Sequence, residues 1–557
     1  MRSTLSKVTA LAAVLALALA ACSSDKSADG AKNETTADGK TIITTFSPSD
    51  PTMNLDTNQV TKLVSDKFKI QFKWQTTTFD AGPAKEKRQI ALASGDYPAL
   101  FFLIPWVDAF TQTEVLKYGK QGVALPLEQL IKDNAPNIQK ALDSNQTLKE
   151  MSTAPDGHIY ALPQWADCYH CTYPDKLWIN STWLKKVGLP MPKTTEELRT
   201  VLQAFKTKDP NGNGKADEIP LTTDAQDSTL LGYLMNAFLF DPIGAKTGVR
   251  SLVSLDGDKV VTPVSKDAYK EGLKYIASLY KEGLINQAAF TQTAAALQAQ
   301  GNNPKAITLG SVPVLYPGIF VQLGAASKDG RDKQYDAVPP LTGPEGKSYT
   351  GLNYPSSTGY TFMLTNKASK EAQVAAIKML DYIYTDEGQM NTNMGPEGVG
   401  WTKPAPGDIA LDEKATPLYK PIQGPQVPKN INWGAMGQYN NTLRYRNAQV
   451  VPKDIYSEAG LERRLFQATK QYEGHEDKAQ QFPLASVWPD PALGAELATL
   501  QTNLDSYVSQ NQLAFITGSK DIDSGWDAFV KGLDSTGMKR YLEIQQQAYD
   551  KYKSGSK

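Results

Sequence analysis

The hydrophobic positions that follow residue 40 change their period from two to about 3.6 and back again. Residues 41–46 form a short apolar run that is typical of a strand. A helix and a second strand are predicted next, with apolar positions at Val60, Leu63, Val64 and Phe68 and then at Ile70, Phe72 and Trp74. Another helix is predicted over residues 84–93, ahead of the apolar run Leu100–Ile104. This strand–helix–strand order favours a mostly parallel, doubly wound sheet.

The rest of the chain repeats the exchange of strand-like and helix-like segments. Residues 177–180 are predicted to form a strand. Four helices are predicted where apolar side chains recur every three or four positions. Their apolar positions are Leu198, Val201, Leu202 and Phe205; Tyr269, Leu273, Ile276 and Tyr280; Val374, Ile377, Leu380 and Tyr384; and, from about residue 536, Met538, Tyr541, Leu542 and Tyr549. The pattern therefore predicts an α/β protein.

The first 21 residues have the pattern of a secretory signal peptide. Arg2 and Lys7 supply positive charge, and residues 8–18 form an uncharged apolar run that is too short to span a bilayer comfortably. Small residues then lead to Leu19-Ala20-Ala21-Cys22, which resembles the lipobox of bacterial lipoproteins. We expect Cys22 to carry acyl chains such as palmitate, which would hold the mature protein at a membrane. An ordinary signal peptide with a chance cysteine is the alternative.

The segment after Cys22 is predicted to be a flexible tether. Residues 22–40 contain no bulky apolar side chain, so they cannot bury enough surface to become ordered. No second membrane segment is predicted, because the best apolar stretch, residues 230–240, is short and ends in Asp241-Pro242. The folded part is therefore expected to begin near residue 41.

The charge balance argues against a nucleic-acid partner. The chain has 58 Lys and Arg against 59 Asp and Glu, and removal of residues 1–21 takes away two of the positive charges. A near-neutral protein has no electrostatic reason to bind a phosphate backbone. The length of 557 residues suits two or three domains with large cores.

Two cysteines remain besides Cys22, and they stand close together at Cys168 and Cys171. In an exported protein such a pair favours a tight disulfide, which would stiffen its loop. A thioredoxin-like redox pair is a weaker interpretation, because the Tyr-rich, Pro-flanked surroundings do not suggest a helix that opens after a strand. A zinc site is a third, and it would need two further ligands, for which His158 and His170 are the nearby candidates.

A resemblance to a known family is carried by several motifs in a fixed order. Residues 91–98, Ala-Leu-Ala-Ser-Gly-Asp-Tyr-Pro, resemble the "ASGDxPD" segment of sugar-type solute-binding proteins of ABC importers, with Ala99 in place of the acidic residue. Further matching segments are Tyr160–Pro163, Leu177–Asn180, Trp183–Leu189 and Pro192–Leu198. Near the end, Phe515–Gly518, Asp521–Asp523, Trp526 and Tyr541–Ile544 resemble the larger lipoprotein branch, which includes alginate-binding and plant-polysaccharide-binding proteins.

This resemblance implies two α/β lobes of the periplasmic-binding-protein type, joined by several hinge crossings, with an oligosaccharide in the cleft between them. Lobe 1 is expected over residues 41–162 and about 356–425, and lobe 2 over residues 163–355 and about 426–557. Crossings are expected near residues 160–163 and 350–360, with a third after Tyr384. The implied partners are the membrane permease subunits of an ABC importer, and the protein is expected to be a monomer at the extracytoplasmic face of the cell membrane.

Residues 209–218 are typical of a calcium-binding loop. Oxygen-bearing side chains occupy its positions 1, 3, 5 and 9, and a glycine occupies position 6. Position 12 is Pro220, whereas a bidentate glutamate is usual there. The alginate-binding relatives carry a similar loop, and the resemblance implies Ca²⁺ ligands at Asp209, Asn211, Asn213, Lys215 through its carbonyl, Asp217 and Glu218. A turn rich in Asn and Gly without a metal is the alternative.

Sugar binding needs flat aromatic faces together with polar groups that can pair with hydroxyls. We therefore look for aromatic side chains in loops and for polar residues beside them. The candidates are Trp165, Asp167, Tyr169, Tyr354, Glu397, Trp401, Trp433 and Arg444, of which Trp165 and Trp401 are favoured because they flank predicted crossings. Trp74, Trp178 and Trp526 follow strand or helix patterns and are assigned to the core.

Three other functions remain open at this point. A secreted polysaccharide lyase or glycosidase is disfavoured, because the chain has no nucleophile elbow, no histidine–metal motif and only 3 histidines. A binding protein for peptides or another solute would have the same fold. A ligand-sensing partner of a membrane receptor would also have it. We therefore expect a protein that binds a solute and catalyses no reaction.

Overall fold

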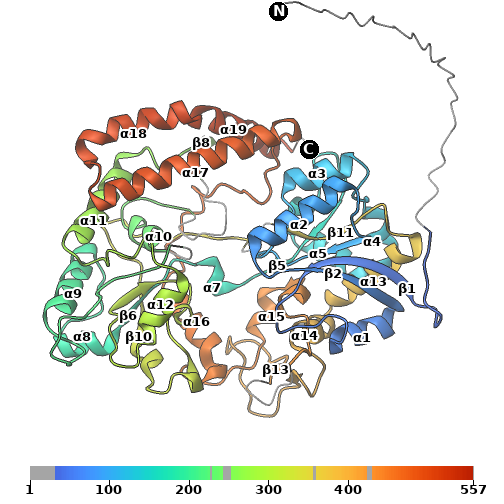
Figure 1. Ribbon diagram of the computed structural model, residues 1–557, viewed down its shortest axis with the longest axis horizontal. Helices are drawn as coiled ribbons and strands as arrows, with labels where there is room; N and C mark the ends of the chain where they lie inside the picture. The colour runs from blue at the N-terminus through green and yellow to red at the C-terminus, as the bar shows by residue number, and fades with distance from the viewer. Residues whose placement is uncertain (1–31, 226–228, 243–251, 356–358, 423–428, 556–557) are drawn as a thin grey trace, which may run out of the picture.

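The computed structural model describes residues 32–225, 229–242, 252–355, 359–422 and 429–555. Figure 1 shows two lobes beside each other and a layer of long helices along one side of them. The signal peptide and Cys22 lie outside the described residues. Among the residues it describes, no helix is long and apolar enough to cross a membrane.

The segment that immediately precedes the first strand is folded against lobe 1. The amide of Ile42 donates to the carbonyl of Glu34 at 2.8 Å. Lys40 Nζ lies 2.7 Å from a carboxylate oxygen of Asp66. Residues 32–40 therefore do not belong to a flexible tether, although their composition predicts one.

Lobe 1 is built on a five-stranded sheet in the order β2-β1-β3-β11-β4. Its strands are β1 (Thr41–Pro48), β2 (Ile70–Thr77), β3 (Leu100–Phe102), β4 (Leu162–Pro163) and β11 (Tyr360–Leu364). β1 runs parallel to β2 and β3, and β11 runs antiparallel to β3 and β4. The helices around this sheet are α1 (Gln59–Phe68), α2 (Ala81–Ser94), α3 (Gln112–Lys120), α4 (Glu128–Asn134), α5 (Pro136–Ser144), α6 (Gln146–Ser152), α13 (Lys370–Ile383) and α14 (Asp386–Met394).

Local chemistry accounts for the first of these helices. The side chain of Asn58 accepts hydrogen bonds from the amides of Val60 and Thr61 and so caps the amino end of α1. Lys69 ends the helix in a left-handed conformation with φ of 56°. Val60 and Val64 are fully buried in the core of lobe 1, as the helical spacing predicts.

Lobe 2 is built on a three-stranded sheet in the order β10-β6-β9. Its strands are β6 (Leu177–Asn180), β9 (Ser311–Pro313) and β10 (Tyr335–Val338), and β6 is antiparallel to both of its neighbours. Parallel bridges join Ile219 to Leu309 and Leu221 to Ile285 nearby. The two-lobed α/β fold is thus as predicted, but the expectation of a mostly parallel sheet is wrong for the named strands of this lobe.

Helices cover lobe 2, and the last of them form the layer at the top of Figure 1. They are α8 (Ser181–Val187), α9 (Thr195–Thr207), α10 (Leu230–Met235), α11 (Asp267–Lys281), α12 (Ala294–Gly301), α16 (Leu461–Thr469), α17 (Gly494–Thr517), α18 (Ile522–Thr536) and α19 (Met538–Lys553). A hairpin of β7 (Ser254–Asp256) and β8 (Lys259–Val261) contacts α19. Phe515, Trp526 and Tyr541 join this layer to the core of lobe 2.

The chain passes between the lobes at several places. β5 (Trp165–Ala166) and β14 (Asn440–Asn441) pair in parallel, so two crossings run side by side. A further crossing connects Leu352, in the core of lobe 2, to β11 in lobe 1. Beyond Phe482 of lobe 2 the chain reaches lobe 1 again, where Ala485 and Trp488 are buried.

The division between the lobes differs from the expected one near residue 426. Trp433, Met436 and Tyr439 are buried in the core of lobe 1, in contact with the side chains of its sheet. The third crossing therefore lies at residues 440–447, well beyond the segment that directly follows Tyr384. The two small β-strands β12 (Trp401–Thr402) and β13 (Lys420–Pro421) also precede this crossing.

Candidate functional site

The strand directions of lobe 1 bring several loops to one edge of its sheet. The carboxyl ends of β1, β3 and β4 lie at the same edge as the amino end of β11. The chain leaves lobe 1 from this edge at residues 164–167 and returns to it at Tyr360, where β11 begins. Ligands of open α/β sheets bind outside the carboxyl ends of the strands, so we search for a site here.

Tyr354 and Trp165 form an aromatic corner at the two crossings. The rings are perpendicular, with their centroids 6.0 Å apart. Trp165 is 2% exposed, whereas Tyr354 is 47% exposed. The indole of Trp165 donates to Asp167 Oδ2 at 3.0 Å, and the amide of Leu443 donates to the same oxygen at 3.0 Å. The buried tryptophan and Asp167 therefore hold Tyr354 with part of its ring open to solvent.

Trp106 is a second exposed aromatic side chain at this edge, and sequence reasoning missed it. It lies in the loop after β3 and is 59% exposed. The loop is held beside the crossing, because Phe110 and Tyr360 exchange two backbone hydrogen bonds of 2.9 and 3.0 Å. The signal that could have found it is a tryptophan just beyond the carboxyl end of the apolar run Leu100–Ile104.

A buried ion pair fixes the loop that carries Trp106. The guanidinium of Arg88 on α2 donates to Asp108 Oδ2 at 2.8 Å and to Glu114 Oε1 at 3.3 Å. Arg88 and Asp108 are both buried. Burial raises the pKa of the Asp108 carboxyl, and the hydrogen bond from Arg88 opposes this shift. Removing Arg88 would leave the Asp108 carboxylate unpaired in the interior, which is costly.

The chain directly after residues 164–167 contains the disulfide that the sequence predicts. Cys168 and Cys171 are bonded, with their Cα atoms 5.0 Å apart, around the single turn α7 (Tyr169–Thr172). His158 lies on lobe 1, where its Nδ1 is 2.6 Å from Glu128, so it cannot serve as a ligand beside the cysteines. The Cys168, His170 and Cys171 ligand atoms lie within 4.8 Å of one another, but the two sulfurs are joined to each other.

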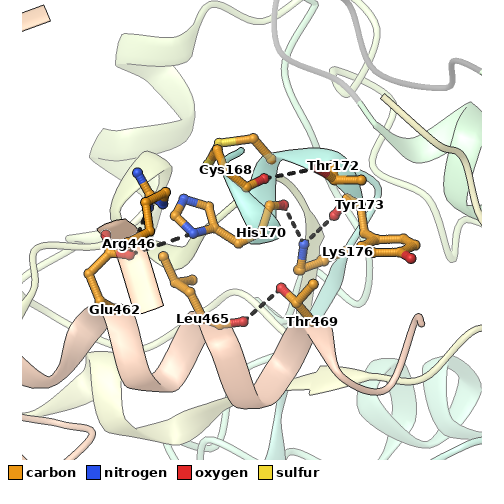
Figure 2. The surroundings of a disulfide bond; sticks show 10 residues. Cys168, His170, Thr172, Tyr173, Lys176, Arg446, Glu462, Leu465 and Thr469 are labelled. Carbon is orange, nitrogen blue, oxygen red and sulfur yellow. Dashed lines mark hydrogen bonds and ion pairs between the residues drawn. A yellow bond between two sulfur atoms is a disulfide. The ribbon is translucent and has the colours of Figure 1, made fainter. Parts of the chain in front are cut away.

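Charged residues from three segments meet beside this disulfide (Figure 2). Arg446 from α15 (Leu443–Asn447) donates to Glu462 Oε2 of α16 at 3.1 Å, and His170 Nδ1 lies 3.7 Å from the same oxygen. Burial lowers the pKa of His170, and the positive charge of Arg446 lowers it further. The histidine therefore remains neutral although it faces a carboxylate.

Tyr169 lies on the lobe-2 side of the disulfide. Its hydroxyl donates to Glu473 Oε2 at 2.9 Å, and its ring lies 5.1 Å from the ring of Phe466. Burial, followed by this hydrogen bond, raises the pKa of Tyr169 above its usual value. The structure thus brings Trp165, Asp167 and Tyr354 together at the crossings, while Tyr169 contacts Glu473 and Phe466.

Trp401 and Trp433, also predicted to contact the sugar, have their ring faces covered. Trp433 is 1% exposed, and the rings of Phe72, Trp74 and Phe102 surround it. Trp401 is 3% exposed and packs in a small cluster with Met390, Tyr419 and Tyr445. The indole groups of Trp433 and Trp401 donate to Thr61 and to Asn391, respectively. These rings are not open to a ligand in this structure.

Glu397 and Arg444 are polar candidates at the surface. Arg444 pairs with Asp386, at the first turn of α14. Glu397 lies 3.8 Å from Lys403. A hollow of about 370 Å³ lies elsewhere, on lobe 2 between α9, α11 and residues 342–344, and none of the predicted sugar contacts lines it.

The predicted calcium loop follows α9 on lobe 2 and closes tightly around one carboxylate. Asp209 accepts hydrogen bonds from the amides of Gly212, Asn213 and Gly214 at 2.9–3.1 Å. Gly212 and Gly214 have φ of 76° and 73°, which a residue with a Cβ rarely adopts. These amides, that of Gly214 first, lower the pKa of Asp209.

The remaining oxygens of the loop fit a hard cation. Asp217 accepts from the side-chain amides of Asn211 at 2.8 Å and of Asn213 at 3.0 Å. Glu218 Oε1 is buried and has no hydrogen-bond partner among the described residues. Burial raises the pKa of Glu218, and the charges of Asp209 and Asp217 add to this shift. A cation that binds only oxygens would relieve this repulsion.

The family comparison matches residues 55–390 to the model of the bacterial extracellular solute-binding proteins. The fructooligosaccharide ABC transporter substrate-binding protein FusA of Streptococcus pneumoniae is 27% identical over 528 residues, which cover 92% of this chain and 90% of that protein. Lipoprotein LipO of Bacillus subtilis is 25% identical over 97% of both chains. Each of these two comparisons therefore spans nearly the whole length of both proteins.

Solved structures show the same fold. An extracellular solute-binding protein from Bifidobacterium longum subsp. infantis matches 93% of this chain and 100% of its own, with a TM-score of 0.73 and 23% identity. FusA in complex with kestose matches 92% of this chain and 100% of its own, with a TM-score of 0.69 and 24% identity. Alginate-binding protein AlgQ2 matches 91% and 98%, with a TM-score of 0.64 and 22% identity. The two-lobed architecture is shared by all three.

Proposed function

The chain belongs to the family of bacterial extracellular solute-binding proteins, and from this premise we propose that it captures an oligosaccharide between its lobes and delivers it to the permease of an ABC-type importer. The observation that carries the proposal is the pair of exposed rings, Trp106 and Tyr354, at the edge where the chain crosses between lobes. Such rings suit the C–H face of a sugar. FusA, a fructooligosaccharide-binding relative, supports the choice of a carbohydrate.

The proposed contacts divide into stacking groups and polar groups. Tyr354 and Trp106 stack on sugar rings, while Trp165 and Asp167 position Tyr354 from behind. Tyr169 offers a hydroxyl from the lobe-2 side. Glu397 and Arg444 would contact the ligand from the protein surface. Trp401 and Trp433 are buried and would pack behind the site without touching the sugar.

The protein binds its ligand and releases it unchanged. The curated relatives are substrate-binding proteins, and the crossings provide hinges about which two lobes can close. Closure would bring Tyr169 of lobe 2 toward the exposed rings of lobe 1. The sugar would leave when contact with the permease subunits favours the open state.

Cys22 is the proposed lipid anchor. The tetrapeptide Leu19-Ala20-Ala21-Cys22 places a cysteine where a lipoprotein signal peptide is cleaved, and LipO is a lipoprotein relative that matches 97% of the chain. Acylation there would hold the protein at the extracytoplasmic face of the cell membrane. We propose that the anchored protein is a monomer. The folded lobes would then collect solute close to the permease.

Ca²⁺ is the proposed ion of the loop at residues 209–218. Asp209, Asn211, Asn213, Asp217 and Glu218 would supply side-chain oxygens, and Lys215 would supply its carbonyl. One solved structure of FusA is that of an EF-hand mutant, so a relative with this fold has a calcium-type loop, which supports the assignment by likeness. The ion would brace the loop after α9, and no step of sugar binding depends on it.

Isothermal titration of residues 32–557 against oligosaccharides, with calcium present, tests the proposal. Recovery of the intact sugar after saturable binding would support a transport receptor. A degraded sugar would point to an enzyme, and binding of peptides alone would keep the fold and overturn the ligand.

A further inference from the structure

We infer that the oligosaccharide is electrically neutral, because each cation at the crossings is already paired with a carboxylate or buried among backbone carbonyls. This inference rests on the proposed function, since it concerns the ligand of the same site. Relatives of both kinds exist: FusA is named for fructooligosaccharides and YtcQ of Bacillus subtilis for polygalacturonan and rhamnogalacturonan. The charged residues at the crossings of this chain are the evidence that favours a neutral over an acidic oligosaccharide.

The first step is a census of cations in the crossing segments, defined as residues 164–176 and 440–447. Among the described residues of these segments, the lysines and arginines are Lys176, Arg444 and Arg446. A uronic acid would need at least one of them without an anionic partner, since bidentate pairing with arginine is the strongest way to hold a carboxylate.

Each of the three cations already has partners. Lys176 is fully buried, and its Nζ donates to the carbonyls of His170, at 2.9 Å, and of Tyr173 (Figure 2). Arg446 donates to Glu462 at 3.1 Å. Arg444 is paired with Asp386. A sugar carboxylate would have to compete with the carboxylate that already neutralises either arginine.

The arginines just beyond the crossings are engaged in the same way. Arg463 donates to the carbonyls of Ala410, Val451 and Pro452 at 2.9–3.0 Å. Arg464 donates to the carbonyls of Asp332 and Tyr335. Their donors hold the chain together around α16 and are not directed at solvent.

Acidic side chains also gather at the crossings. The acidic residues that belong to the crossing segments or contact them are Asp167, Asp175, Asp386, Glu462, Glu473 and Glu476. Asp167 and Glu473 lie beside the aromatic corner and beside Tyr169. Like charges at close range in a partly dry site disfavour a charged ligand strongly. Acceptors of this kind pair well with sugar hydroxyls.

The test compares probes that differ only in charge. Tetragalacturonate and its carboxyl-reduced tetrasaccharide are titrated beside neutral tetrasaccharides of fructose, glucose, galactose and mannose, at 20 mM and 200 mM salt. We expect a neutral tetrasaccharide to bind with a Kd that salt barely changes, and tetragalacturonate to bind far more weakly. Tight binding of tetragalacturonate that weakens with salt would overturn the inference and keep the proposed function. Failure of every sugar would overturn the proposed function itself.

A pair of variants tests whether the ion pairs are the reason. Asp386→Asn releases Arg444, so affinity for tetragalacturonate should rise by about tenfold, the value of one charge-assisted hydrogen bond. Asp66→Asn is the matched control, because it releases Lys40, which precedes β1 and so lies at the opposite edge of the lobe-1 sheet. An equal gain in both variants, or none in Asp386→Asn, would overturn the role assigned to the paired arginine.

Discussion

Trp165 and Tyr354 are in contact, and one ring is buried while the other is exposed. The tryptophan is tied to Asp167 and hardly reaches solvent, whereas the tyrosine leans on it edge-on and leaves about half of its own surface open. A ring that is fixed before the ligand arrives loses little entropy on binding. The stiffness of Tyr354 is therefore as important to affinity as its exposure.

Replacing an exposed ring at the crossing edge should weaken sugar binding without unfolding the protein. We expect Trp106→Ala and Tyr354→Ala each to raise the Kd by about tenfold, since a lost aromatic contact is worth about 1 kcal/mol or more. Titration calorimetry measures the Kd, and a thermal melt without ligand checks the fold. Ile90→Ala is the control, because Ile90 is 60% exposed on α2 but is not at this edge. Unchanged affinity in both aromatic variants would relocate the site.

The histidines at positions 158 and 170 should affect stability in opposite directions as the pH changes. The Glu128 carboxylate raises the pKa of His158, so its stabilising contribution is present below pH 6.5 and is lost as the pH rises through the folded-state pKa. Burial lowers the pKa of His170, so its unfolded form binds more protons below pH 6.5 and acid destabilises the fold.

Melting curves between pH 5 and pH 8 separate the two effects. His170→Asn should lessen the fall in Tm from pH 6.5 to pH 5, by about 1 °C for each 1 kcal/mol involved. His158→Gln should instead lower Tm mainly at the acidic end. A steeper acid slope in His170→Asn would show that the Glu462 carboxylate outweighs burial at this histidine.

Local periodicity predicted the helices and strands well, because the apolar side chains that each element buries recur at that element's own period. Residues 84–93 lie within α2 (Ala81–Ser94), and the strand expected at residues 41–46 is β1 (Thr41–Pro48). Pairing is not local. The short β6 run carries no information about β9 and β10, which arrive more than a hundred residues later and run antiparallel to it. The same limit explains Trp433, whose Asn-Trp-Gly context resembles an exposed loop until Phe72, Trp74 and Phe102 surround it.

The calcium loop should respond to metal as a unit. Calcium at a hundred times its Kd should stabilise the wild-type protein by about 2.7 kcal/mol, visible as an upward shift in Tm. Asp209→Ala with Asp217→Ala should abolish that shift and lower the melt in chelator only slightly. Asp143→Ala, which removes an exposed carboxylate from α5, should keep the full response. A wild-type melt that is identical in calcium and in chelator would remove the assignment.

At the scale of the whole molecule, the lobes are connected at two distinct places. The crossings β5 and β14 lie between them, and the segment 483–491 reaches from lobe 2 onto lobe 1. Trp488 enters the core of lobe 1, where its indole donates to the carbonyl of Glu150 at 3.2 Å and its ring lies 5.8 Å from Tyr360. Tyr552 at the end of α19 also donates to Glu150. In Figure 1 the end of the chain lies beside α3, on the side of the helical layer. The proposed closure about the crossings would therefore be restrained on one side by this second contact.

Trp488→Ala should release that restraint and change the ligand-free molecule more than the bound one. Loss of a buried indole costs about 3–5 kcal/mol at its site, so the segment should detach from lobe 1. Small-angle scattering should then give a larger radius of gyration without ligand and a wild-type value with it, because the sugar holds the lobes together. The amides of α3, of Ala492 and of Leu493 should exchange faster, while those of β6 should not. Trp526→Ala removes an equal side chain inside lobe 2 alone, so it should lower Tm and leave the radius unchanged. An unchanged radius in both variants would mean that the crossings alone set the spacing of the lobes, and that the carboxyl-terminal layer takes no part in closure.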